Sequence, residues 1–135
     1  MNYIKTNNKW ARQRGTTLVE LSVVMAVILL LATVLFIGVA GWRDAANRSA
    51  AIVEISSIQK AVRGFQNTNL LNVGDPVTAA TDIAPYFNGT LPTDPSQNGA
   101  AFTYGNTIPA IGTVFATSGN AATMTQLGKL NTANW

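Results

Sequence analysis

The chain has 135 residues and a formal net charge of +3; 47% of its residues are hydrophobic and only 11% are charged. This length accommodates one small domain rather than two. The sequence contains no cysteine and no histidine, which excludes disulfides, a thiol nucleophile, a cysteine-linked lipid anchor and the usual zinc ligands.

The positive charge is concentrated near the N-terminus. Four basic residues and no acidic residue fall within the first 15 positions: Lys5, Lys9, Arg12 and Arg14. The remaining residues include five basic and six acidic side chains, a formal charge of −1 before the termini are counted. The basic character therefore belongs to a short N-terminal segment, and we expect no nucleic-acid partner.

A long uncharged run follows this segment. Between Glu20 and Arg43, the 22 residues from Leu21 to Trp42 include no ionisable side chain. As an α-helix rising about 1.5 Å per residue, the run is roughly 33 Å long, enough to cross a hydrocarbon core of about 30 Å. A soluble helix of this length and uniformity would need a much larger protein around it. We therefore predict a transmembrane helix.

Two common kinds of membrane segment account for part of this pattern. A secretory signal peptide would have a small-x-small cleavage site such as Gly38-Val39-Ala40, but its apolar core is usually only about 7–15 residues long. An uncleaved signal anchor would keep its basic end in the cytoplasm, although Arg43 and Arg48 follow the span closely and weaken that asymmetry. Neither interpretation explains Glu20 at the start of the span.

A third interpretation accounts for both Gly15 and Glu20. The segment from Arg12 to Leu21, RQRGTTLVEL, resembles the class III leader junction of type IV pilins and type II secretion pseudopilins. The resemblance implies that prepilin peptidase cleaves the leader on the cytoplasmic side after Gly15. Thr16 would then be the first mature residue and would be N-methylated by the same enzyme. Glu20 occupies the fifth mature position, where the family has its characteristic glutamate.

The charges near the predicted cleavage site suit this resemblance. Cleavage leaves a cationic amine on Thr16, one helical turn before Glu20, and the two charges can pair within one chain. The resemblance implies instead that Glu20 attracts the amine of a neighbouring subunit, a pairing that an apolar medium favours over an isolated charge. Glu20 is thus predicted to act in subunit assembly. The alternative is an interfacial carboxylate that assists the N-terminus of the helix.

Two positions depart from the family pattern. The first mature residue is usually phenylalanine or methionine, whereas this chain has Thr16. Many pilins have a proline where this chain has Ile37, so the resemblance does not imply a helix break there. Gly38 and Gly41 either loosen the helix nearby or allow close packing of neighbouring helices.

The helix is expected to continue beyond the span. Residues 43–66 contain no proline, and five apolar residues recur there at spacings of 4, 3, 4 and 3: Ala51, Ile55, Ile58, Val62 and Phe65. This spacing predicts one apolar stripe. We expect a single helix from about Thr17 to Gln66, roughly 75 Å long, that ends at Asn67-Thr68-Asn69. A coiled coil is the alternative, although fewer than four clean heptads are present.

Residues 67–100 are rich in the Pro, Gly, Asn and Asp residues that mark turns. Thr81 or Asp82 is expected to cap one helical turn over Ile83 to Phe87. The segment from Tyr86 to Pro95 resembles the loop that follows the long helix in major pseudopilins and short pilins. In those proteins, a Leu-Pro-x-Asp-Pro-like turn leads into the first strand.

Three short strands are predicted after this loop: Ala101 to Tyr104, Ile111 to Thr117, and Ala122 to Leu127. An antiparallel meander of these strands on the amphipathic half of the helix would bury six side chains: Phe102, Tyr104, Val114, Phe115, Met124 and Leu127. A three-stranded sheet alone is only marginally stable, so the helix stripe is its necessary partner.

The sequence offers no catalytic constellation. Past Glu54 its carboxylates are Asp75, Asp82 and Asp94, no histidine accompanies them, and the glycines form no phosphate-binding pattern. We therefore predict no catalytic residue, no cofactor and no metal. Major pseudopilins commonly bind calcium in an acidic C-terminal loop, and here Asp94 is the last acidic side chain. Without cysteine, the chain also lacks the C-terminal disulfide of many type IV pilins.

These features predict an α+β, pilin-like fold in which one long N-terminal α-helix, transmembrane in its first half, packs against a small three-stranded antiparallel sheet. The expected segments are a removed basic leader (1–15), the transmembrane and filament-core half of the helix (16–42), its amphipathic half (43–66), a Pro/Gly-rich αβ-loop (67–100), and the small sheet with the C-terminal tail (101–135).

The resemblance implies a non-enzymatic structural subunit of a type IV pilus-like filament, which polymerises with copies of itself. The predicted filament-core residues of the helix are Leu21, Val24, Ile28, Leu31 and Leu35. The implied partners are prepilin peptidase and the inner-membrane assembly platform and ATPase. We expect a single-pass precursor in the bacterial inner membrane and then an extracellular or periplasmic filament. The alternatives are a pseudopilin of a type II secretion system and a monomeric, signal-anchored binding module.

Overall fold

The structure is a computed structural model that describes the backbone of residues 9–130 and the side chains of residues 17–130. The chain divides into two units, Met1–Trp42 and Arg43–Trp135. Helix α1, Lys9–Thr68, belongs to both units. We call the second unit the head and describe each unit by itself.

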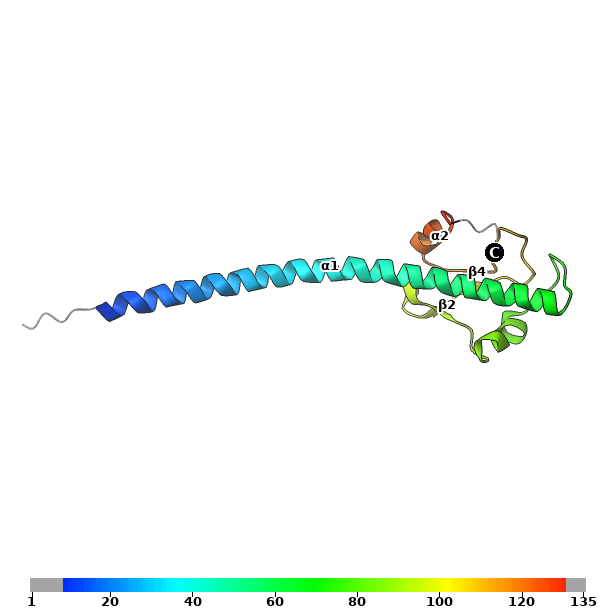
Figure 1. Cartoon of the computed structure of the whole chain (residues 1–135), viewed down its shortest axis with the longest axis horizontal. Helices are drawn as coiled ribbons and strands as arrows, with labels where there is room; N and C mark the ends of the chain where they lie inside the picture. The colour runs from blue at the N-terminus through cyan, green and yellow to red at the C-terminus, as the bar shows by residue number, and fades with distance from the viewer. Residues whose placement is uncertain (1–8, 131–135) are drawn as a thin grey trace, which may run out of the picture. The chain divides into compact units, whose positions relative to one another are not determined.

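Helix α1 has 60 residues and extends beyond the predicted range at both ends (Figure 1). Its C-terminal end lies at the predicted terminator. The backbone N–H and the side-chain Nδ2 of Asn69 both donate to the carbonyl oxygen of Phe65, each at 3.0 Å. Leu70 then adopts a positive φ of 54°, which a continuing helix cannot accommodate. The chain therefore turns back after Thr68.

The predicted apolar stripe is confirmed as the centre of the head. Ala51, Ile55, Ile58 and Val62 are buried in the core, and Phe65 packs against it. The six core side chains predicted from the C-terminal region also lie there: Phe102, Phe115 and Leu127 are buried, while Tyr104, Val114 and Met124 are partly buried. The stripe is thus the surface on which the rest of the head is built.

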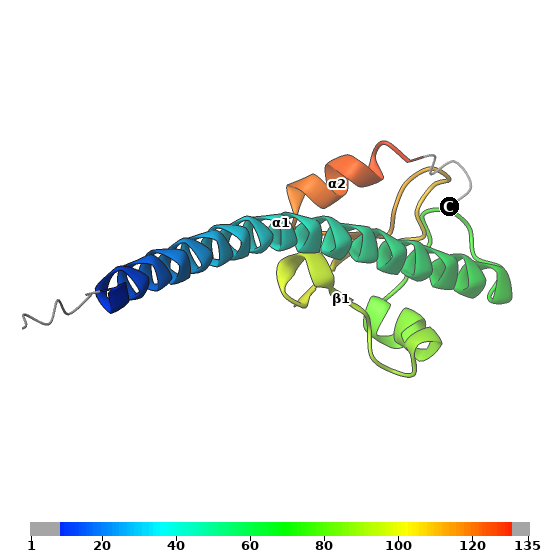
Figure 2. The ribbon, with the colours of Figure 1, turned by 60° about the vertical axis from the view of Figure 1, so that its left-hand side comes forward.

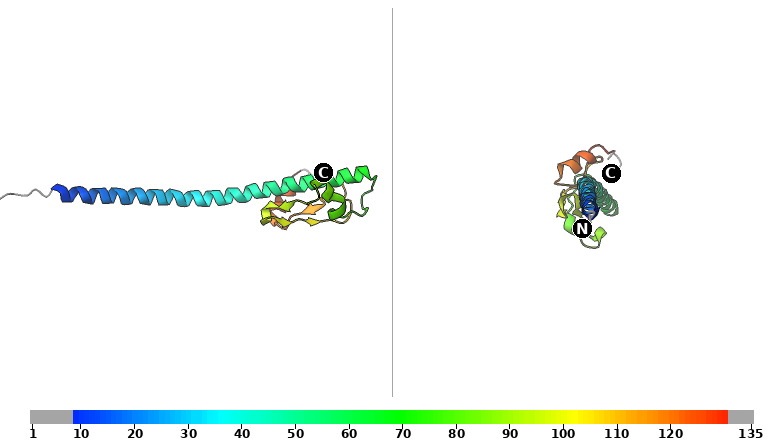
Figure 3. Two further views of the ribbon diagram at one scale, coloured as in Figure 1. Left: turned by 90° about the horizontal axis from the view of Figure 1, so that it is seen from below. Right: turned by 90° about the vertical axis from the view of Figure 1, so that its left-hand side faces the viewer.

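Eight short elements follow α1 in the described part of the head. They are η1 (Ala79–Ile83), η2 (Ala84–Phe87), β1 (Thr93–Asp94), η3 (Pro95–Gln97), β2 (Ala100–Ala101), β3 (Thr103–Tyr104), β4 (Ala116–Thr117) and α2 (Ala121–Leu127). Figure 2 shows α2 on one side of the C-terminal half of α1, with η1, η2 and β1 on the other. In the left view of Figure 3, the strands lie along one side of this half.

The predicted three-stranded sheet is wrong for the described residues, which form two separate antiparallel pairs. Strands β1 and β2 pair with Thr93 opposite Ala101. Strands β3 and β4 pair with Thr103 opposite Thr117, and an isolated bridge joins Pro76 to Thr107. The strand predicted over residues 101–104 is therefore divided between the two pairs.

The strand predicted over Ala122 to Leu127 is also wrong, because these residues belong to helix α2. Asn120 caps this helix: its Oδ1 accepts from the backbone N–H of Ala122 at 3.0 Å and of Thr123 at 3.3 Å. Thr123 and Leu127 are one helical turn apart and both are buried. A strong N-cap and a helical spacing of buried residues therefore outweigh the strand pattern.

The strand predicted over Ile111 to Thr117 is largely wrong, since only Ala116–Thr117 forms a strand. Gly112 adopts a φ of 84°, which interrupts an extended conformation. The backbone of the preceding residues is held by side chains of α1 instead. Arg63 donates to the carbonyl oxygens of Pro109 at 2.8 Å and Ala110 at 3.2 Å.

The helical turn predicted over residues 83–87 is longer than expected and has a different start. It consists of η1 and η2, and neither has a side-chain cap at its N-terminus. Asp82 lies inside η1, and its Oδ2 accepts from the backbone N–H of Thr78 at 2.7 Å. The predicted capping of Ile83–Phe87 by Thr81 or Asp82 is therefore wrong, although Asp82 does bind a backbone N–H.

Candidate functional site

The apolar part of α1 in the first unit has no packing partner among the described residues. All its side chains from residue 17 to 42 are exposed except that of Ala32, which is half-buried. The five predicted filament-core residues are among them: Leu21, Val24, Ile28, Leu31 and Leu35. A helix that is apolar on every side is stable only when lipid or other apolar helices surround it. This segment therefore requires a covering medium outside the described chain.

A membrane is one such medium. Among the described residues, one helical segment, Thr17–Thr68, is long and apolar enough to cross a bilayer, judged by length and composition. Its N-terminal position and its uncharged run agree with a membrane-anchored precursor.

The hydroxyl groups of this segment are compatible with an apolar medium. Ser22 Oγ donates to the carbonyl oxygen of Val19 at 2.8 Å, and Thr33 Oγ1 donates to that of Leu29 at 2.8 Å. Because these two hydroxyl protons are bonded within their own helix, their transfer from water leaves neither donor unpaired.

Glu20 is the one acidic side chain in the described part of the first unit, and it is exposed on α1. Its carboxylate makes no hydrogen bond or ion pair with the residues described from 17 to 130. The 22 residues that follow have no ionisable group. The carboxylate is therefore open to a partner outside this part of the chain.

The predicted cleavage site lies just before Glu20. Gly15 and Thr16 are within the backbone of α1, and the side chain of Thr16 is outside the described set. The spacing along the helix places Thr16 one turn before Glu20. The structure therefore brings the backbone of the predicted methylation site near the predicted assembly residue, while the roles of Gly15, Thr16 and Glu20 stay predictions.

Gly38 and Gly41 pack against no other described residue. A Cβ atom added to either residue would meet nothing within 4 Å. Helix α1 continues through Ile37 and Gly38 without interruption. The space beside these two glycines is therefore open to a neighbouring helix from another chain.

Sequence reasoning missed two buried polar side chains in the head. The first is Gln59, which is 1% exposed and lies on the apolar stripe one turn after Ile55. Its Nε2 donates to the carbonyl oxygen of Thr113 at 3.1 Å, and its Oε1 accepts from the N–H of Phe115 at 2.9 Å. A polar residue within an apolar stripe was the available signal for such a contact.

The second is Asp94, which has no exposed surface. Its Oδ1 accepts from the backbone N–H of Ser96 at 2.9 Å and from Ser96 Oγ at 2.6 Å, and its Oδ2 accepts from Ser118 Oγ. Asn120 extends the network: its N–H donates to Ser118 Oγ at 2.9 Å, and its Nδ2 donates to Ser96 O at 3.2 Å. The carboxylate network therefore joins η3, which directly follows β1, to the start of α2.

The described residues hold no cluster of three or more histidine, cysteine, aspartate or glutamate side chains that is suitable for a metal ion. The polar groups around Asp94 satisfy one another, and no buried side-chain nitrogen or oxygen atom in the described part of the chain lacks a hydrogen-bond partner. The N-terminal segment is therefore the region with the clearest functional features.

Comparison with known proteins bears on this same segment. Residues 10–36 match the family model of the prokaryotic N-terminal methylation motif. No curated protein and no solved structure matches the chain. The matched range begins in the basic segment, includes Gly15, Thr16 and Glu20, and ends within the apolar run.

The chain is thus of the class whose N-terminal helix carries a prokaryotic methylation motif. This motif is the class III signal of type IV pilins and pseudopilins. Together with the long apolar helix and the small antiparallel strand pairs, it supports a type IV pilin-like or pseudopilin protein with an α+β fold. The motif implies a pilin-type structural protein and processing by prepilin peptidase.

Proposed function

We propose that this protein is a structural subunit of a type IV pilus-like filament. One observation carries the proposal: the matched methylation motif includes an exposed carboxylate, Glu20, that has no partner among the residues described from 17 to 130. A run of 22 uncharged residues, which extends beyond the motif, follows it directly. A monomeric membrane anchor has no need of a charge at this position, whereas an assembling helix can use it to select its neighbour.

The proposed sequence of events starts with the precursor in the inner membrane. Prepilin peptidase hydrolyses the peptide bond between Gly15 and Thr16 with one water molecule. It then transfers a methyl group from an external methyl donor to the new amine, which releases one proton and, as a basic secondary amine, is still positively charged at neutral pH. In the apolar interior, the carboxylate of Glu20 then pairs with the amine of a neighbouring subunit, since an isolated charge there is costly. This pairing sets the axial register between subunits.

The apolar helix supplies the remaining contacts. Leu21, Val24, Ile28, Leu31 and Leu35 leave the lipid and pack against the helices of other copies. The inner-membrane assembly platform and its ATPase extract the subunit, and the resulting filament is extracellular or periplasmic. The heads, each built on its own amphipathic stripe, remain outside the helical core.

The first test is the intact mass of the filament fraction sheared from cells that express the full-length protein. We expect the loss of residues 1–15 and the gain of one methyl group. A mature chain that starts near Gly41 would instead indicate a secreted soluble domain and would contradict the proposal.

The second test separates assembly from export. Glu20→Gln keeps the size of the side chain and removes its charge, so we expect normal cleavage and a strong loss of filaments. Glu54→Gln, the same change in the head, is the matched control and should assemble normally. Filaments of normal amount and length from Glu20→Gln cells would contradict the proposed pairing and favour a monomeric, signal-anchored module.

The same motif serves pseudopilins of type II secretion systems, which are the alternative within this class. Location separates the two: a pilus subunit is recovered from the sheared cell surface, and a pseudopilin is recovered from the periplasm. Genes for a retraction ATPase near this gene would favour the pilus.

A further inference from the structure

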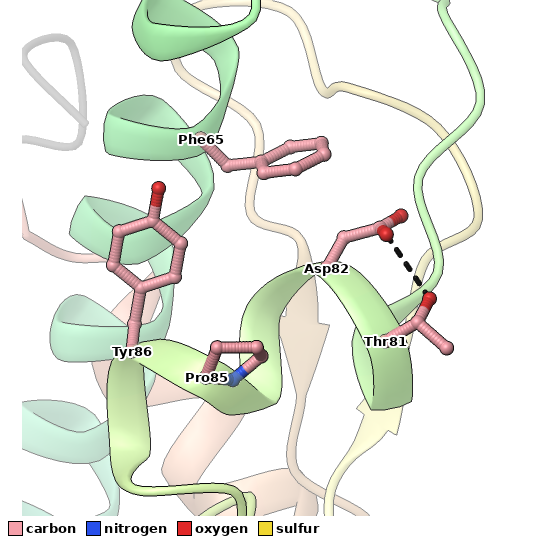
Figure 4. A pocket seen from close by; sticks show the side chains of 5 residues that line it. All are labelled: Phe65, Thr81, Asp82, Pro85 and Tyr86. Atoms are coloured by element: carbon pink, nitrogen blue, oxygen red, sulfur yellow. Dashed lines mark hydrogen bonds between the residues drawn. The ribbon is translucent and has the colours of Figure 1, made fainter.

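The head has a cup of about 380 Å³ that is separate from the N-terminal segment. Helix α1 contributes Phe65, and η1 and η2 contribute Thr81, Asp82, Pro85 and Tyr86. Figure 4 shows the rings of Phe65 and Tyr86 on neighbouring sides of this cup, with Pro85 below them and the Asp82 carboxylate across from Tyr86.

The two aromatic rings are held by the packing of η2 on α1. Phe65 is partly buried against the core, while Tyr86 remains 48% exposed. The Tyr86 ring lies against the helix at Gly64, where an added Cβ atom would be 3.5 Å from its Cε1 atom. Aromatic faces carry partial negative charge and attract cations. The walls of the cup therefore suit a positively charged group with an apolar surface.

Asp82 supplies a fixed negative charge at the same cup. Its Oδ2 accepts from Thr78 N at 2.7 Å, and its Oδ1 accepts from Thr81 Oγ1 at 3.0 Å. These bonds hold the carboxylate in place and leave each oxygen with a further lone pair. No basic side chain described in residues 17–130 forms an ion pair with it. The half-buried charge is therefore without a cationic partner in this part of the chain.

We propose that this cup binds a quaternary ammonium group. Such a group has no N–H donors and is weakly hydrated, so the carbon atoms of the aromatic and proline side chains can replace its hydration shell. The faces of the rings and the carboxylate of Asp82 attract its positive charge. A primary ammonium brings three donors and a tightly held hydration shell, which this lining replaces poorly. The chemistry is shared by a choline headgroup and a trimethylated lysine side chain.

The test uses the full-length protein in maltoside micelles, which contain no choline, and follows the amide NMR signals of residues 79–87. Choline chloride is titrated against the same concentrations of sodium chloride. We expect saturable shifts in the millimolar range with choline. Dimethylbutanol, in which carbon replaces the choline nitrogen, should bind at least about fivefold more weakly, because it keeps the shape and lacks the charge.

Three variants assign the binding to the cup. Tyr86→Leu removes the exposed ring and should weaken choline binding by about fivefold or more, whereas Tyr86→Phe keeps the ring face and should remain within about twofold of the wild type. Asp82→Asn should weaken binding by a similar factor to Tyr86→Leu, provided that its spectrum away from the cup is unchanged. If Asp82→Asn disturbs the fold, the two Tyr86 variants decide.

Several outcomes would overturn the proposal. These are the absence of saturable shifts with choline, equal affinity for dimethylbutanol, tighter binding of lysine amide than of choline, or unchanged binding by Tyr86→Leu. Phosphocholine and trimethyllysine amide are then compared. The tighter ligand identifies the source of the group as a headgroup or a modified side chain, and either result supports the site.

Discussion

The Oε1 atom of Gln59 accepts a hydrogen bond of 2.9 Å from the backbone N–H of Phe115, which is 56 positions away in the chain. The same side chain donates to the carbonyl oxygen of Thr113 at 3.1 Å. One glutamine on α1 therefore satisfies a donor and an acceptor that a neighbouring strand would otherwise satisfy. This contact explains how residues 113–115 can pack on a helix without belonging to a sheet.

Replacement of Gln59 by leucine is expected to destabilise the head by about 2 kcal/mol, because it leaves the Phe115 N–H and the Thr113 carbonyl buried without partners. The free energy of unfolding can be measured by urea titration of the full-length protein in micelles, followed by near-UV circular dichroism. Gln126→Leu is the matched control, since Gln126 is exposed. Equal stability of the two variants would contradict the role given to Gln59.

Asp94 holds two segments together, and its replacement by alanine should cost about 3 kcal/mol of unfolding free energy. The substitution removes the acceptor for Ser96 N–H, Ser96 Oγ and Ser118 Oγ in a buried environment. Asp44→Ala is the control, because Asp44 is exposed. The same urea titration distinguishes them, and a loss below about 1 kcal/mol for Asp94→Ala would show that the network can rearrange without its acceptor.

Asn120 caps α2, so Asn120→Ala should lower the unfolding free energy by about 1–2 kcal/mol. Asn120→Asp tests the two functions of the side chain separately: a carboxylate can still accept from the N–H groups of Ala122 and Thr123, but it cannot donate to Ser96 O. We expect its stability to lie between those of the wild type and the alanine variant. An aspartate variant less stable than the alanine variant would indicate that the charge beside Asp94 dominates.

The raised pKa of the Tyr104 hydroxyl predicts that the head loses stability at alkaline pH. Burial raises the pKa of its hydroxyl above the ordinary value, and the charge of Glu54 raises the pKa further. The folded state thus favours the neutral form, which also donates to the carbonyl oxygen of Pro92 at 3.1 Å. The stabilisation from this pKa difference is complete below the unfolded pKa of about 10 and is lost as the pH rises through the folded pKa.

Tyr104→Phe should remove this part of the alkaline loss while costing about 1 kcal/mol at neutral pH through the missing hydrogen bond. The measurement is the unfolding free energy across the alkaline range, together with tyrosinate absorbance of both proteins. An identical alkaline slope in the variant would assign the loss to other groups.

The sequence predicted α1 and its packing stripe well, because a helix of this length repeats its apolar spacing many times without proline. The head was less predictable. A two-residue strand is too short to show the alternating pattern from which strands are predicted. In residues 121–127, the N-cap supplied by Asn120 favours a helix despite their strand-like composition. Gln59 and Arg63 replace strand pairing over residues 109–115 by contacts from a distant part of the chain, which no local pattern contains.

The two candidate sites differ in the same way. The segment around Gly15 and Glu20 is a linear signal, so its residues could be identified from spacing alone. The cup of Phe65, Asp82 and Tyr86 exists only because η1 and η2 pack on α1, and nothing in the local sequence around these residues indicates that they meet.

The link through Asp94 has a mechanical consequence. A disulfide bond forms only with an oxidant and, once reduced, needs an oxidant to form again. The head instead joins residues 94–96 to residues 118–123 through one carboxylate and a small set of hydroxyl and amide hydrogen bonds. Under a pulling force these hydrogen bonds can break and then form again, and neither step needs an oxidant or a reductant.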